Sequence, residues 1–119
     1  SNWNLIETER YARDFRHFEK KFPDELDAML INLNAYFKTL RQVGHPMQIK
    51  AGFIHHEPDG IKAIDQKGGQ QKVKLKQSRL YVYPKMSELR LYLLAIGDKR
   101  TQQQDIQLCR QWVRALNRK

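Results

Sequence analysis

The chain has 119 residues, a formal net charge of +9 at neutral pH, 40% apolar residues and one cysteine, Cys109. A chain of this length is typical of one domain, expected here over 1–119, and can bury a hydrophobic core without metal ions or disulfides. The lone cysteine excludes an internal disulfide, which suits the reducing cytoplasm, and no apolar run approaches the ~18 residues of a membrane span.

The N-terminal part is predicted to form a short strand and two helices. We expect no signal peptide, and Ser1-Asn2 resembles the remnant of a cleaved purification tag, so the fold should begin near residue 3. Residues 3–7 are predicted to form an edge strand. Aromatic side chains recur at spacings of four, three and four over 11–22, and apolar ones at four, three, four and three over 26–40. Both spacings predict amphipathic helices, which a short turn at Pro23 should pair antiparallel.

From residue 48 the apolar period changes to that of strands. The alternation predicts strands over 48–56, 61–65, 72–83 and 89–96. Glu57-Pro58-Asp59-Gly60 is a strong turn signal, and a change of parity predicts a bulge or break near Gln77-Ser78. Thr101 and Gln104 fit the capping box of a last helix. The order of elements predicts an α+β fold, with helices packed on one face of an antiparallel sheet.

The positive charge is concentrated in the second part of the chain. Residues 1–47 carry seven Lys or Arg and seven Asp or Glu, whereas 48–119 carry 15 and six, and 66–87 contain no acid. A concentrated positive field attracts polyanions, so we expect a nucleic acid or an acidic protein as partner; a basic protein without such a partner is the alternative. The histidines and Cys109 lack metal-ligand spacing, so we expect no metal and no other cofactor.

Three segments, in this order and at this spacing, resemble one protein family. They are ETERYARDFRHFEKKFPDEL at 7–26, RLYVY at 79–83 and LYLLAIGDKRTQQQDIQ at 91–107. Together they resemble the RelE/ParE toxin superfamily, and its HigB-type members most. The resemblance implies a RelE-like fold and the cytoplasmic toxin of a bacterial type II toxin–antitoxin system. Such a toxin would cleave mRNA, free or on the ribosome, and would be neutralised by a cognate antitoxin, here expected to be a helix-turn-helix protein.

Two other functions are compatible with the same resemblance. The family also contains ParE-like toxins that bind gyrase and cut nothing, and a phage-derived regulatory protein would share the fold. Many ribonuclease members have a Tyr or His directly after the last strand, where this chain has Thr101 followed by glutamines.

Cleavage in this group is implied to proceed by attack of the ribose 2′-OH on the adjacent phosphate, which needs a base, an acid and cations. Arg79 matches the family's strand arginine, and Lys99 and Arg100 match its basic turn. Histidine titrates near neutral pH and suits proton transfer, but alternation sends His55 and His56 to opposite faces, so at most one can point into a site.

Further residues are candidates for completing the site or for binding RNA. Lys62, Asp65 and Lys67 lie just across the predicted hairpin from the histidines and could complete the site. The tyrosines of the central strand can stack on unpaired bases or pack across the strand, and basic side chains can bind phosphate or simply face solvent. The RNA-binding candidates are Lys62, Lys67, Lys72, Lys74, Lys76, Tyr81, Tyr83 and Lys85.

Overall fold

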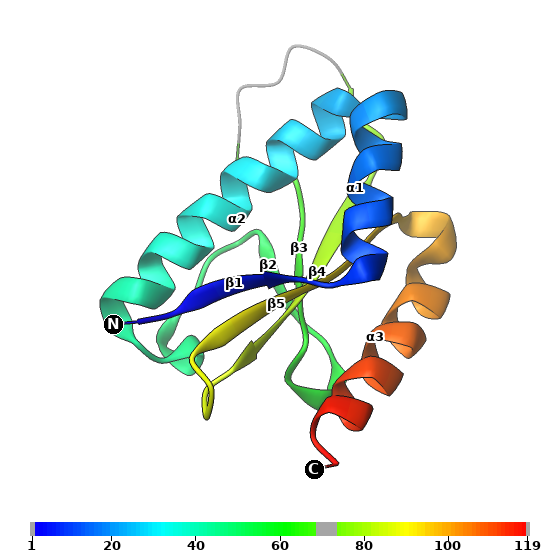
Figure 1. The fold of residues 1–119 in the computed structure, drawn as a ribbon. Coiled ribbons are helices and arrows are strands. Elements are labelled where there is room, and N and C mark those ends of the chain that lie inside the picture. Colours follow the sequence, from blue (N-terminus) through cyan, green and yellow to red (C-terminus); the bar gives the residue numbers. More distant parts are fainter. Residues whose placement is uncertain (1, 69–73, 119) are drawn as a thin grey trace.

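The computed structural model describes residues 2–68 and 74–118, which form an α+β fold with three α-helices and one five-stranded mixed sheet (Figure 1). The strands are β1 (Asn4–Glu7), β2 (Ile54–His56), β3 (Lys62–Ile64), β4 (Ser78–Lys85) and β5 (Arg90–Asp98). The helices are α1 (Glu9–Lys21), α2 (Pro23–Val43) and α3 (Gln102–Leu116). Among the described residues, no helix is long and apolar enough to cross a membrane.

The sheet has the strand order β1-β5-β4-β3-β2. The strands β2 to β5 pair antiparallel, as the sequence predicts, but β1 lies parallel to β5 at one edge. The expectation of an all-antiparallel sheet is therefore wrong at β1. Leu89 and Leu93 accept hydrogen bonds from the backbone amides of Asn4 and Thr8, at 3.0 and 3.2 Å. A strand of four residues carries too little pattern to fix its direction, which follows here from the docking of α1 onto β5.

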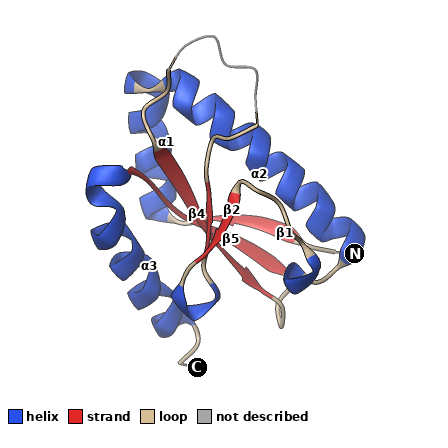
Figure 2. Ribbon diagram, turned by 180° about the vertical axis from the view of Figure 1, so that it is seen from behind, coloured by secondary structure: helices blue, strands red, loops and turns tan. Residues whose placement is uncertain are grey.

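Helices cover both faces of the sheet, which corrects the expectation that they pack on one face. The helices α1 and α2 share a core with Leu80 and Val82 of β4, whereas α3 packs through Cys109 and Val113 against a second core that contains Tyr81. In Figure 2 the sheet lies between α2 and α3. Buried strands with apolar residues at both parities, such as β4, are typical of sheets covered on both sides.

The predicted strand boundaries are only partly confirmed. Of 48–56, the structure makes a strand of the last three residues, and residues 46–48 form a turn of 3-10 helix. β4 begins at Ser78, so the strand predicted over 72–83 is wrong at the described residues 74–77, and the position expected for a bulge or break, Gln77-Ser78, is where the strand starts. The irregular pairing lies elsewhere, because Tyr81 and Val82 pair with Ala95 and Leu93, which leaves Leu94 as an extra residue in β5.

Candidate active site

His55 and Asp65 form a hydrogen-bonded pair at the β2–β3 edge of the sheet. His55 faces Ala63 in the β2–β3 register, and Asp65 follows β3 two residues later, on the same face. The His55 Nε2 atom lies 2.7 Å from Oδ2 of the buried Asp65. An ionised carboxylate can only accept a hydrogen bond, so the imidazole proton lies on Nε2. This arrangement leaves Nδ1 as the ring nitrogen that can accept a proton.

Arg79 of β4 shares a hollow with Asp65 and Lys67. The hollow has a volume of about 310 Å³, and Leu75, Gln77 and Ser78 also line it. The Arg79 Nη1 atom lies 3.8 Å from Oε2 of Glu57, which is beyond hydrogen-bonding distance. The Arg79 side chain is 29% exposed, and its guanidinium is a fork of donors suited to phosphate oxygens.

Hydrogen bonds from Asn32 and Gln66 hold the two segments that line this hollow, residues 65–67 and 75–79. The buried Asn32 of α2 donates from Nδ2 to the carbonyls of Asp65 and Lys67, at 2.8 and 2.9 Å. Gln66 donates to the Lys76 carbonyl and accepts from the Ser78 amide, both at 2.6 Å. A site needs such support, because its groups must hold one geometry without a ligand to order them.

Lys67 and Tyr81, both predicted to bind RNA, differ in their exposure to solvent. The Lys67 side chain is 72% exposed, and its Nζ lies 3.8 Å from Asp65 Oδ2, so it is placed to meet an anion at the site. Tyr81 is wholly buried beneath α3, and its hydroxyl has no hydrogen-bond partner among the described residues. Burial raises the pKa of Tyr81 above its usual value. The prediction that its ring stacks on bases is wrong, because α3 covers this face of β4.

His56 and Lys62 contact each other and do not take part in the His55 pair. Lys62 is 7% exposed, and its Nζ lies 2.8 Å from Nδ1 of His56. Burial lowers the pKa of Lys62. The opposite orientations expected of His55 and His56 agree with these separate partners. The structure therefore favours His55 over His56 as the proton-transfer candidate.

A second hollow, of about 440 Å³, gathers three of the RNA-binding candidates at the other end of β4. Lys62, Tyr83 and Lys85 line it. The Tyr83 hydroxyl accepts from Asn117 Nδ2 at 3.0 Å, and Lys85 Nζ lies 3.4 Å from Glu88 Oε2. These side chains are engaged in local contacts and do not line the hollow that contains Arg79.

The remaining basic candidates lie around the start of β4. The Lys99 amide donates to the Gln77 carbonyl at 3.3 Å, which brings the basic turn beside this strand, and the Lys99 side chain is exposed. Arg100 and Lys76 both pair with Asp98, at 3.2 and 2.9 Å. No described contact joins Lys99 or Arg100 to Arg79, so their catalytic roles stay predictions. Lys74 is exposed, and Lys72 lies outside the described residues.

The chain matches no protein-family model, and comparison with curated proteins and with solved structures finds no match. The resemblance to RelE-like toxins therefore remains an expectation, and the geometry carries the functional argument. Within 2–68 and 74–118, no group of three or more His, Cys, Asp and Glu side chains is arranged to hold a metal ion.

Glu57 and Asn32 belong to the site and were not predicted from the sequence. Glu57 lies two residues after His55, so alternation alone could have placed it on the same face, but the turn signal at 57–60 drew the interpretation toward a loop. Asn32 interrupts the apolar stripe of α2, and a polar residue in such a stripe is the available signal for a buried hydrogen bond.

Proposed function

We propose that this chain is an RNA-cleaving toxin of a bacterial type II toxin–antitoxin system, acting on mRNA in the cytoplasm. The observation that carries the proposal is the His55–Asp65 pair, because Asp65 also lines the hollow that contains Arg79 and Lys67. A proton acceptor with an orienting carboxylate, beside cations with exposed donors, is what attack by a ribose hydroxyl on phosphate requires.

The reaction follows from the chemistry of RNA. The 2′ oxygen forms a bond to phosphorus, and the bond from phosphorus to the 5′ oxygen of the next nucleotide breaks. Nδ1 of His55 takes the 2′ proton, and the leaving 5′ oxygen receives a proton from the resulting imidazolium or from water. The products are a 2′,3′-cyclic phosphate and a 5′-hydroxyl end. Asp65 stabilises the imidazolium and keeps the ring in place, since it bonds to the other nitrogen.

Arg79 and Lys67 supply the positive charge for this step. The attacked phosphate gains negative charge on its non-bridging oxygens, and a guanidinium can contact two of them at once. The loose contact between Arg79 and Glu57 can be exchanged for phosphate at little cost, because it lacks hydrogen-bond geometry. Lys67 adds a mobile point charge at the rim of the same hollow.

The adjacent histidines provide a matched test. Purified protein is incubated with single-stranded RNA, alone and in a translation extract that contains ribosomes, and the product ends are analysed. We expect 2′,3′-cyclic phosphate ends, loss of cleavage in His55→Ala, and retention in His56→Ala, whose ring contacts Lys62 instead. Equal loss in both variants, or no cleavage under either condition, would contradict the proposal.

The toxin assignment has its own test in cells. Induced expression should arrest growth, His55→Ala should relieve the arrest, and a small protein encoded beside this gene should co-purify with the chain as its antitoxin. A toxin that acts by binding a protein target, as the ParE-like alternative has it, would still arrest growth with His55→Ala. That outcome would contradict RNA cleavage and favour a toxin that acts by binding a protein.

A further inference from the structure

A groove lies between α1 and the start of α3, apart from the hollow that contains Arg79. Its volume is about 670 Å³. We call it the α1 groove; its charged and histidine side chains are Arg10, Arg13, Asp14, His17, Lys21, Lys76, Asp98, Arg100 and Asp105. Five Lys or Arg against three Asp leave this lining with a net charge of +2 when His17 is neutral.

Two of the three acids in the α1 groove are held in a network that ties α1 to β5 and α3. Arg10 donates from Nε to Asp14 and from Nη2 to Asp105, both at 2.9 Å. Asp14 also accepts from the Ile96 amide at 3.0 Å, and Asp105 accepts from the Thr101 hydroxyl at 2.7 Å. These carboxylates are therefore occupied by partners within the fold.

The third acid, Asp98, is shared by two cations. Lys76 and Arg100 donate to its carboxylate at 2.9 and 3.2 Å. Although partial burial acts to raise it, these hydrogen bonds lower the pKa of Asp98 to about 2. The acids of the groove are thus balanced by Arg10, Lys76 and Arg100, and the net positive charge comes from the other basic side chains.

The surplus charge belongs to one face of α1. Arg13, His17 and Lys21 are exposed, follow one another four residues apart, and all line the groove. Neither Arg13 nor Lys21 forms an ion pair with any residue of 2–68 or 74–118. Successive members are about 6 Å apart along the helix axis, which is close to the separation of consecutive phosphates in an extended single strand.

The α1 groove adjoins the candidate active site. Lys76 lines the groove, whereas Gln77 and Arg79, on the same stretch of chain, line the hollow beside Asp65. The Lys76 ammonium lies 4.5 Å from the centre of the Phe22 ring at the end of α1. An RNA strand that extends from Arg79 past the start of β4 would therefore meet Lys76 and then α1.

We propose that the α1 groove binds backbone phosphates of the RNA strand that flanks the scissile bond, through Arg13 and Lys21, with His17 between them. This inference rests on the proposed function, because it takes RNA as the ligand. It adds a second contact region beyond the cleavage site and predicts that the substrate must extend several nucleotides from the cleaved bond. Contacts of this kind add affinity without reading sequence.

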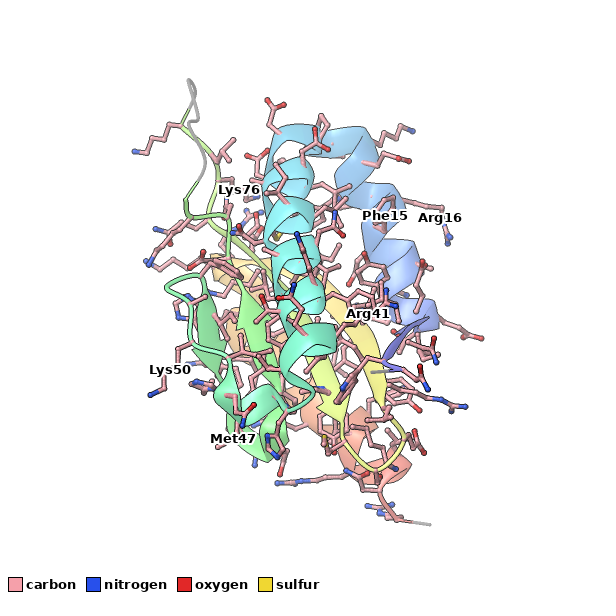
Figure 3. The ribbon with its side chains drawn as sticks, turned by 90° about the vertical axis from the view of Figure 1, so that its left-hand side faces the viewer. Phe15, Arg16, Arg41, Met47, Lys50 and Lys76 are labelled. Atoms are coloured by element: carbon pink, nitrogen blue, oxygen red, sulfur yellow. The ribbon has the colours of Figure 1, made fainter. Side chains whose placement is uncertain are left out.

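The test compares two double variants of the same helix. Arg13→Ala/Lys21→Ala removes two charges from the groove, and Arg16→Ala/Lys20→Ala removes two exposed charges that do not line it. Figure 3 shows Arg16 extending from α1 into solvent, on the side of the view away from Lys76. The probe is a fluorescent 12-nucleotide single-stranded RNA with 2′-O-methyl riboses, which cannot be cleaved by 2′-OH attack, and binding is measured by anisotropy over a range of salt concentrations.

Each phosphate contact contributes about 0.7 to the slope of log affinity against log salt for a single strand. Loss of two contacts should therefore lower the slope by about 1.4 and weaken binding about 25-fold at 0.1 M salt, if the curves meet at 1 M. Arg16→Ala/Lys20→Ala should leave the slope within about 0.3 of the original, a bound set by the 0.7 per contact. Melting curves should be alike for both variants, and Arg13→Gln/Lys21→Gln replaces the first pair if it fails to fold.

Several outcomes would overturn the groove proposal. They are unchanged RNA affinity in Arg13→Ala/Lys21→Ala, an equal loss in Arg16→Ala/Lys20→Ala, or unchanged RNA affinity together with lost binding of a poly-glutamate peptide, which would assign the groove to an acidic protein segment. The binding assay needs no cleavage, so it separates the two proposals. Absent cleavage with a groove-dependent affinity would refute the nuclease and leave the RNA groove standing.

Discussion

Replacement of Arg79 tests the candidate site most directly. Arg79→Ala removes the fork of donors assigned to the scissile phosphate, and loss of one such transition-state contact should lower kcat/KM by about 100- to 1000-fold. Arg79→Lys should recover little of this, because it keeps the charge and loses the fork. Cleavage of a short fluorogenic RNA under single-turnover conditions gives the rate, and growth arrest gives a readout in cells.

The structure also sets the expected effect of this change on stability. The side chain is 29% exposed, and its ion pair with Glu57, at 3.8 Å, is loose. Such pairs contribute at most about 0.5 to 1 kcal/mol, so the melting temperature should fall by no more than a few degrees. Arg90 provides a control, because it pairs with Glu88 at the same 3.8 Å but lies at the opposite end of the β4–β5 pair, outside the hollow. If Arg79→Ala cleaves RNA as fast as Arg90→Ala with unchanged melting, the site assignment is refuted.

Three further changes test other parts of the structure. Asp65→Asn should lower kcat by up to about 100-fold with KM little changed, since proton transfer through a misoriented imidazole is impaired; a fall in KM alone would contradict the positioning role. Asp98→Asn should destabilise the fold at pH 7 by about 1 to 2 kcal/mol, allowing for solvent screening. The pKa of Asp98 is lowered from 3.8 to about 2, so the difference in unfolding free energy between the two proteins should be constant above pH 5 and should shrink as the pH falls from 4 to 2. Urea unfolding at each pH measures it, and a full difference that persists at pH 2 would exclude the charged contacts as its source. Gly97→Ala should cost about 1 to 3 kcal/mol in thermal or urea unfolding, because the added Cβ would overlap the Asp105 carboxylate; unchanged unfolding would show that the carboxylate moves aside freely.

The helices could be predicted from the sequence because their stripes are long. The stripe over 26–40 repeats through four turns, and α2 extends over Pro23–Val43, close to the predicted bounds. The face chosen by α3 could not be predicted, since the stretch from Leu91 to Ile96 is apolar at nearly every position and indicates no preferred side. The parallel direction of β1 could not be predicted either, because pairing direction depends on the whole fold and four residues do not determine it.

Within the site, the sequence predicts the placement of side chains where strand alternation decides it, and does not where burial decides it. Arg79 and His55 face one part of the sheet because strand alternation places them there. Tyr81 has the same parity as Arg79, yet α3 covers it, and an aromatic residue fits a core as well as a stacking surface. Arg100 pairs with Asp98 and lines a different hollow from Arg79, which no spacing in the sequence reveals.

Hydrogen bonds from the Gln66 side chain indicate where this protein can accept inserted residues. One amide side chain joins the Lys76 carbonyl and the Ser78 amide to the end of β3, so the chain is fastened on both sides of residues 69–73. Lengthening a connection between two fastened points is cheap, because a doubling of its length costs only about 0.6 kcal/mol in closure entropy. Insertions, epitope tags or segments that alter RNA preference can therefore be placed between these two points while Arg79 and Asp65 keep their positions.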